Sequence, residues 1–188
     1  TPCEHSFPTR RSSDLAGTAR DVSFLIDFLG PTLFPHDERV ITDYFVSGIS
    51  LGGHSTWLAL AHGASTPRSC RARTRSRRFC ADPRISLGIP IIGSPSLLTL
   101  LSHRAASLAP PLGPLPIAAP FFPASLLALV ARDDPVNTPI EAWKGRKILV
   151  LSGADDTLVN YEIGGSGAWV AMLKAAGVDV EAVVQSGV

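Results

Sequence analysis

Residues 41–63 restrict the fold of this chain more than any other segment. They read ITDYFVSGISLGGHSTWLALAHG: a short apolar run at 44–46, a turn rich in glycine and serine, and then apolar residues at helical spacing. An apolar run that stops at glycine and is followed by helical periodicity predicts a buried strand, a sharp turn and a helix. Units of this kind build parallel α/β sheets.

The turn within this segment has the pattern of a reactive serine. Gly48, Ser50 and Gly52 form Gly-x-Ser-x-Gly, which between a strand and a helix is the nucleophile-elbow motif. Such a serine stands on a tight turn, and we expect a side chain at either glycine to clash with neighbouring backbone. The first helical amide, that of Leu51, would face the oxygen that becomes negative during acyl transfer. The plain alternative is a glycine-rich turn without a function.

With the next residues the motif reads Gly-x-Ser-Leu-Gly-Gly-His, and here the chain resembles the α/β-hydrolase superfamily in a form shared by many serine esterases, lipases and related peptidases. The resemblance implies an α/β fold, namely a mostly parallel sheet flanked by helices with a cap-like insertion. It also implies cleavage of an ester, amide or related acyl bond in a small-molecule or peptide substrate through a Ser50 acyl-enzyme. The resemblance implies no metal and no organic cofactor.

A second strand is predicted at residues 147–153, which read KILVLSG. The residues after it resemble the acid motif of the superfamily, Gly-x-x-Asp-x-x-Val, at Gly153, Asp156 and Val159. The resemblance implies that Asp156 orients the catalytic histidine and stabilises its charged form. Asp155 is the alternative acid, and a solvated Asp-Asp turn is the alternative without a function.

The catalytic histidine of the superfamily has no counterpart at its usual place, after the strand predicted at residues 179–185. Five histidines are present, and all precede the acid: His5, His36, His54, His62 and His103. Although His54 lies four residues after Ser50, the direction of side chains along a helix favours a packing role for it. A His-Gly-Gly-like segment for the second oxyanion donor is also missing. The resemblance therefore predicts that this chain by itself has little or no turnover.

Other segments fit the same architecture. Residues 93–145 correspond to the place where the superfamily inserts caps and lids, and their leucines, phenylalanines and prolines could line an acyl pocket. Ordinary packing on the sheet edge explains these residues equally well. The remaining predicted elements are helices at 21–30 (ended by Gly30-Pro31), 96–109, 124–132 and 165–176, a strand at 85–92, and an irregular proline-rich segment at 110–123.

Residues 1–15, TPCEHSFPTRRSSDL, differ from the rest of the chain. From His5 onward they resemble a translated sequencing adapter, and the alternatives are a disordered arm or a basic transit-like segment. We exclude them from fold reasoning and expect a partial hydrolase domain over 16–188. The sequence then indicates no compartment, with cytoplasmic as the default, and contains no apolar run long enough to span a membrane.

The segment 64–81 is rich in arginine. Residues 64–84 hold seven of the 17 basic residues but one of the 16 acidic ones, so the net charge of +1 conceals an acidic remainder. Deleting 63–81 would join a helix, a loop and a strand, which favours a retained intron over a functional basic loop. We expect a disordered excursion and no nucleic-acid partner. Its two cysteines, Cys70 and Cys80, are too few for a zinc site.

Two other function classes remain open. One is a non-catalytic binding module of hydrolase fold, and the other, less favoured, is an arginine-rich nucleic-acid binder. The oligomeric state is not indicated. Because the superfamily has several strands before the helix predicted at 21–30, we expect this domain to expose an apolar edge and an apolar face of its sheet.

Overall fold

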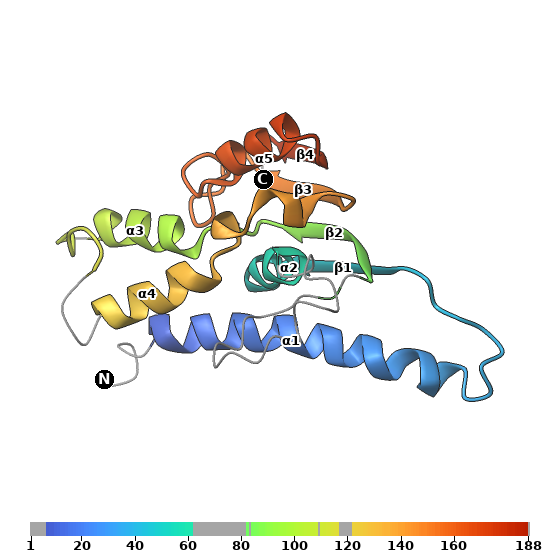
Figure 1. The fold of residues 1–188 in the computed structure, drawn as a ribbon. Helices are drawn as coiled ribbons and strands as arrows, with labels where there is room; N and C mark the ends of the chain where they lie inside the picture. The colour runs from blue at the N-terminus through green and yellow to red at the C-terminus, as the bar shows by residue number, and fades with distance from the viewer. Residues whose placement is uncertain (1–6, 62–81, 83, 109, 117–121, 188) are drawn as a thin grey trace.

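The structure is a computed structural model. It describes residues 7–61, 82, 84–108, 110–116 and 122–187, and Figure 1 shows a parallel sheet with helices packed on it. The strands are β1 (Tyr44–Ile49), β2 (Ile85–Ile91), β3 (Lys147–Gly153) and β4 (Asp179–Gln185). The helices are α1 (Phe7–Leu33), α2 (Leu51–Ala61), α3 (Leu97–Ser107), α4 (Ala124–Asp133) and α5 (Ser166–Ala175), with short 3₁₀ turns η1 (Pro135–Asn137) and η2 (Ile140–Trp143).

The sheet has the strand order β1-β2-β3-β4, and every neighbouring pair is parallel. Because the chain moves one strand at a time in one direction, right-handed crossovers place the connecting helices on the same face. The main core lies on that face. At its centre Trp143 packs edge-on against Trp57 and Trp169, with ring centroids 5.9 and 5.5 Å apart, above the buried Val150 of β3.

The opposite face of the sheet is not covered by the described elements. Exposure alternates along β1, where Phe45 and Ile49 are 70% and 64% exposed, and Val183 of β4 is 47% exposed. Parallel sheets are normally covered on both faces. The expectation of an exposed apolar face is therefore confirmed, and so is the partial α/β architecture.

Most of the predicted elements are present. The strands predicted at 147–153 and 179–185 have those bounds in the structure, and the other elements, except the first helix, differ by a few residues at their ends. The described part of the proline-rich segment, 110–116 with 122–123, contains no helix and no strand. The arginine-rich segment 64–81 lies outside the described residues, so its predicted disorder and origin stay predictions.

Helix α1 is the main correction. The sequence predicted a helix at 21–30 that ends at Gly30-Pro31, whereas α1 runs from Phe7 to Leu33 with Pro31 inside it. Pro31 lies in the last turn, where carbonyls can face water, and the backbone continues with a 2.9 Å bond from Phe34 N to Gly30 O. Leu15 is only 2% exposed and belongs to the main core. Excluding it from the fold was wrong, although the adapter origin of residues 1–15 stays a prediction.

Helices α3 and α4 form a hairpin within the predicted cap-like region, 93–145. The hairpin has a hydrophobic cluster of its own, separate from the main core. The cluster consists of the buried Phe122, Leu126 and Val130, packed against Leu97, Leu98, Leu101, Leu115 and Leu127. Among the described residues no helix is both long and apolar enough to cross a membrane.

Candidate active site

The predicted site residues lie at one edge of the sheet. Since all four strands are parallel, their carboxyl ends share an edge: Ser50 follows β1, residues 92–96 follow β2, and Asp155 and Asp156 follow β3. Helices α3 and α4 extend from this same edge (Figure 1). Crevices at the carboxyl ends of strands are where open α/β sheets bind their ligands.

Ser50 has an unusual backbone conformation. It is exposed, lies between the end of β1 and the start of α2, and has a φ of 55°, in the left-handed region that side chains other than glycine rarely adopt. Its amide donates to the carbonyl of Ile91 at 2.9 Å, which ties the turn to β2. Leu51 begins α2, and the amides of a first helical turn have no acceptor within the helix. The predicted sequence of strand, turn and helix is confirmed.

The glycines of the motif have different roles. A Cβ at Gly48 would lie 2.3 Å from the carbonyl oxygen of Gly52, as the clash argument requires. A Cβ at Gly52 would meet nothing within 4 Å, so the predicted clash at that position was wrong. The second close contact occurs at Gly53, where a Cβ would lie 2.7 Å from the Ile91 carbonyl oxygen. The Gly-Gly pair in the sequence was the signal for it.

The turn after β2 holds the first turns of α2 in place. The indole N–H of Trp57 donates to the Gly93 carbonyl at 3.1 Å, and the amide of Ser94 donates to Nδ1 of His54 at 2.9 Å. His54 is 7% exposed. Nδ1 also lies 2.9 Å from the carbonyl oxygen of Ser94, so it accepts from the amide or donates to the carbonyl according to the tautomer of the ring. This environment fits a packing role for His54.

The two neighbouring acids face different partners. Oδ1 of Asp156 accepts the amides of Leu158 and Val159 at 2.7 and 2.9 Å, which fixes the carboxylate within its own turn. Oδ2 of Asp155 accepts the amide of Gly187 at 2.8 Å, so this carboxylate binds the turn that follows β4. The structure thus brings both acids to the edge that carries Ser50.

A buried polar cluster lies behind Ser50 and was missed by sequence reasoning. Asp134 is 3% exposed and accepts a 2.8 Å hydrogen bond from the hydroxyl of Ser96. Burial raises the pKa of Asp134 above its ordinary value, although bonds from Ser96 and from the amides of Leu97 and Leu98 oppose that effect. Nothing in the sequence near Asp134 indicates these partners, because they lie 36–38 positions away.

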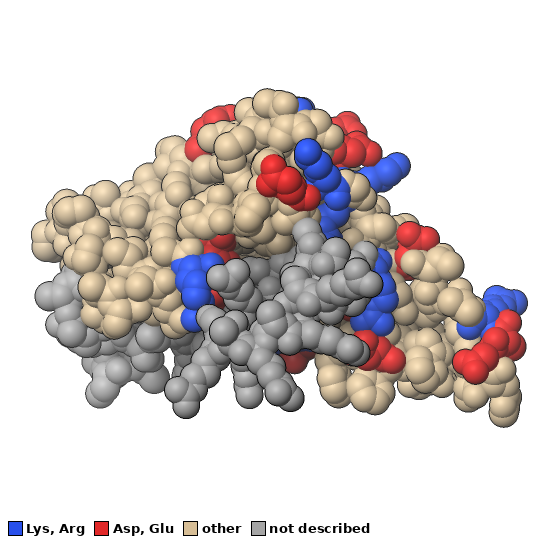
Figure 2. Space-filling model, in the orientation of Figure 1, with Lys and Arg blue, Asp and Glu red and all other residues tan. Residues whose placement is uncertain are grey.

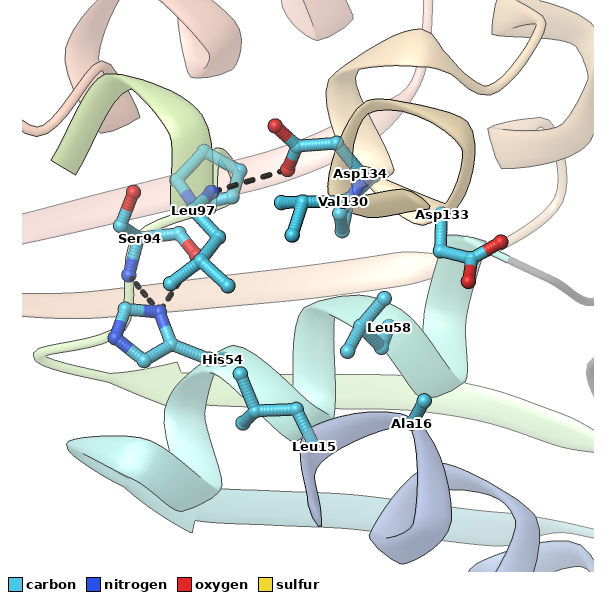
Figure 3. Close-up of a pocket in the computed structure, with 11 residues that line it drawn as sticks. Leu15, Ala16, His54, Leu58, Ser94, Leu97, Val130, Asp133 and Asp134 are labelled. Carbon is cyan, nitrogen blue, oxygen red and sulfur yellow. Dashed lines mark hydrogen bonds between the residues drawn. The ribbon is translucent and has the colours of Figure 1, made fainter. Parts of the chain in front are cut away.

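A small cavity adjoins this cluster (Figure 3). Its volume is about 30 Å³, which is room for a water molecule. His54 and Leu58 of α2 face Leu97, Val130 and Asp134 across it. The cavity therefore marks the contact between the α3–α4 hairpin and α2.

The described side chains bear on a metal site and, on the face seen in Figure 2, on a basic patch. No three or more His, Cys, Asp or Glu residues of the described part are grouped so that they could hold a metal ion. On the face seen in Figure 2, the described basic and acidic side chains are scattered and interspersed.

Neither a protein-family model nor a curated protein sequence matches this chain. A solved acylaminoacyl peptidase in complex with Z-Gly-Gly-Phe-chloromethyl ketone aligns at a TM-score of 0.56 and 18% identity, over 89% of this chain and 22% of that one. The Pyrococcus horikoshii acylaminoacyl peptidase aligns at 0.53 and 16%, with the same coverage. SOBER1 of Arabidopsis thaliana aligns at 0.46 and 20%, over 94% of this chain and 56% of that one.

These alignments define the class of fold. The two peptidase alignments show that the chain has a partial α/β-hydrolase fold, which is the fold that the motif around Ser50 indicated. The chain spans 22% of the length of those two solved peptidases.

Proposed function

We propose that this chain carries the nucleophile and the acid of a serine hydrolase that cleaves an ester, amide or related acyl bond. The observation that supports this most is the exposed Ser50 with a φ of 55° at the junction of β1 and α2. Backbone strain of this kind costs free energy and persists only where the surrounding structure maintains it. Such residues are found most often at functional sites. The two solved peptidases with this fold are consistent with a small-molecule or peptide acyl substrate.

In the proposed reaction the Ser50 oxygen attacks the acyl carbon and loses its proton to a base. The amide of Leu51 donates to the oxygen that becomes negative, and the base returns the proton to the departing alcohol or amine. Water then releases the acyl group by the same steps in reverse. Asp156 would hold the imidazole and stabilise its charged form.

The base is not assigned to a described histidine. His36 lies in the segment that leads into the amino end of β1, at the opposite edge from Ser50. His54 has its Nδ1 bound to the Ser94 amide, and His103 lies on α3. In this proposal the chain by itself has little turnover until a base is supplied.

Supplying a base tests the proposal directly. The protein is treated with a fluorophosphonate with and without imidazole, and the adduct on the Ser50 peptide is quantified by mass spectrometry. A positioned base contributes about 10²–10⁴-fold, so we expect imidazole to accelerate labelling by roughly tenfold. Labelling should be lost in Ser50→Ala and reduced in Asp156→Asn, and Asp155→Asn is the matched control.

The same experiment decides the second candidate, a non-catalytic binding module of hydrolase fold. The observation in its favour is the lack of a suitably placed base among the described histidines. If Ser50 stays unlabelled with and without imidazole while the protein is folded by circular dichroism, the hydrolase proposal is wrong and the binding module is favoured.

A further inference from the structure

The first turn of α3 is completed by a residue from the far end of the α3–α4 hairpin. The amides of Leu97 and Leu98 donate to the two carboxylate oxygens of Asp134, at 3.1 and 3.5 Å. The amide of Thr99 donates to the hydroxyl oxygen of Ser96 at 3.1 Å, and that of Leu100 to the Ser96 carbonyl at 3.2 Å. Every amide of this turn thus has an acceptor, and Asp134 supplies two of them.

The carboxylate of Asp134 also joins the two ends of the hairpin. Ser96 lies just before α3 and Asp134 just after α4, and the 2.8 Å bond from the Ser96 hydroxyl links them. A negative charge is favoured at the amino end of a helix. Because Asp134 is 3% exposed, its partners are costly to lose, since each would leave a polar group without a partner in a dry environment. One side chain therefore closes a loop of nearly forty residues at its base.

The segment that leads into the hairpin contacts the helix that follows Ser50. Ser94, two residues before Ser96, donates its amide to His54, and the His54 amide donates to the Ser50 carbonyl at 3.1 Å. In Figure 3 His54, Leu97 and Asp134 surround the same small cavity. Asp134 is thus linked by hydrogen bonds through Ser96, Ser94 and His54 to the backbone of Ser50.

We propose that Asp134 is a positioning residue, which fixes the α3–α4 hairpin beside Ser50 so that the hairpin forms one wall of the acyl-binding site. The assignment of that wall to an acyl site rests on the proposed function. The closure of the hairpin by Asp134 is independent of the proposed function.

Hydrogen exchange of Asp134→Asn tests the closure. An amide group keeps the size of the side chain but offers one acceptor oxygen in place of two, so a donor of α3 loses its partner. We expect the amides of Leu97 and Leu98 to exchange at least about tenfold faster, and that of Val150 in β3 to be unchanged. Asp133→Asn is the matched control, because the neighbouring Asp133 pairs with Arg132 outside the cluster.

Unchanged exchange at Leu97 and Leu98, or an equal effect in Asp133→Asn, would overturn the proposal. If Asp134→Asn does not fold, Ser96→Ala replaces it. That variant removes one donor to Asp134 and the acceptor of the Thr99 amide, and faster exchange confined to residues 97–99 is then required. Loss of protection spread equally over β3 counts against the proposal.

Alkylation of a Ser50→Cys protein tests the wall without any need for catalysis. The rates with iodoacetamide and with the bulkier fluorescein maleimide are measured at residue 50 by peptide mass spectrometry, with Asp134 and with Asp134→Asn. In Asp134→Asn, where the hairpin is released, we expect the alkylation rate of the bulky reagent to rise at least about threefold relative to that of the small one. If the ratio of the bulky-reagent rate to the small-reagent rate is unchanged, the hairpin is not a wall of the site, even if Ser50 proves to be a nucleophile. If this ratio rises in Asp134→Asn, the wall is supported even if Ser50 is never labelled by fluorophosphonate.

Discussion

At the scale of single residues, the turn at Ser50 is shaped by contacts that its motif does not display. The sequence singles out Gly48 and Gly52, yet the close backbone contacts are at Gly48 and Gly53. Gly53 meets the backbone of β2 and of the turn after it, where Ile92 has a φ of 45°. Two residues with strained backbone, Ser50 and Ile92, thus directly follow neighbouring strands.

This difference gives a prediction for two adjacent glycines. Gly53→Ala should lower the free energy of unfolding by about 1–3 kcal/mol, because its Cβ would press on the Ile91 carbonyl. Gly52→Ala should be neutral or stabilising by up to about 1 kcal/mol, because alanine has the higher helix propensity and the space is open. Urea unfolding of both variants measures the difference, and equal losses would contradict it.

A second residue-scale prediction concerns pH. Burial acts to raise the pKa of Asp82, but hydrogen bonds and the positive charge of Arg84 outweigh it, so the pKa lies below its usual range. A lowered pKa in the folded state adds stability above the unfolded value, 3.8, and this stability is lost as pH falls through the folded value. The difference in unfolding free energy between wild type and Asp82→Asn should therefore shrink from pH 7 to pH 3. A difference independent of pH would contradict the assignment.

At the scale of elements, helix α1 extends beyond the part of the fold against which it packs. Leu15, Ala19 and Ile26 are buried along one stripe of the helix, while Leu29 and Leu33 continue that stripe with 42% and 54% exposure. Figure 1 shows the end of α1 extending past the sheet. The apolar stripe of α1 therefore extends beyond the described elements that cover it.

Matched truncations along this stripe should show where the contact ends. Ile26→Ala removes a buried side chain and should cost about 2–4 kcal/mol in unfolding free energy. Leu33→Ala changes a side chain that is 54% exposed and should cost less than about 0.5 kcal/mol. Urea midpoints compare the two, and a large loss for Leu33→Ala would indicate a contact that the described fold lacks.

At the scale of the whole molecule, the described elements cover one face of the sheet only. Phe45 and Ile49 stand exposed on β1, an edge strand without a charged residue or proline in its sequence YFVSGI. The other edge strand, β4, carries Asp179 and Glu181. Charges protect an edge from pairing with other chains, so the β1 side is the part of the sheet where self-association is expected.

Replacing Phe45 and Ile49 together by threonine should reduce that association. Threonine keeps β propensity while removing apolar surface, so the secondary structure by circular dichroism should be unchanged. Sedimentation velocity should show a smaller associated fraction than for wild type. Met172→Thr, at a 48% exposed position on α5, is the matched control, and an equal effect there would argue against the sheet face.

The sequence by itself determined the order of elements and which residues stand at the strand ends. The strands 147–153 and 179–185, the turn at Ser50 and the helix that follows it are written in local apolar runs and glycine stops, which act over a few residues. Tertiary structure alone decided which glycine is sterically required, how far α1 extends, and what Asp134 binds. Those outcomes depend on partners that are distant in the chain, such as Ile91 beside Gly53 and Ser96 beside Asp134. Contacts of this kind arise only when strands and helices pack, and local patterns do not encode them.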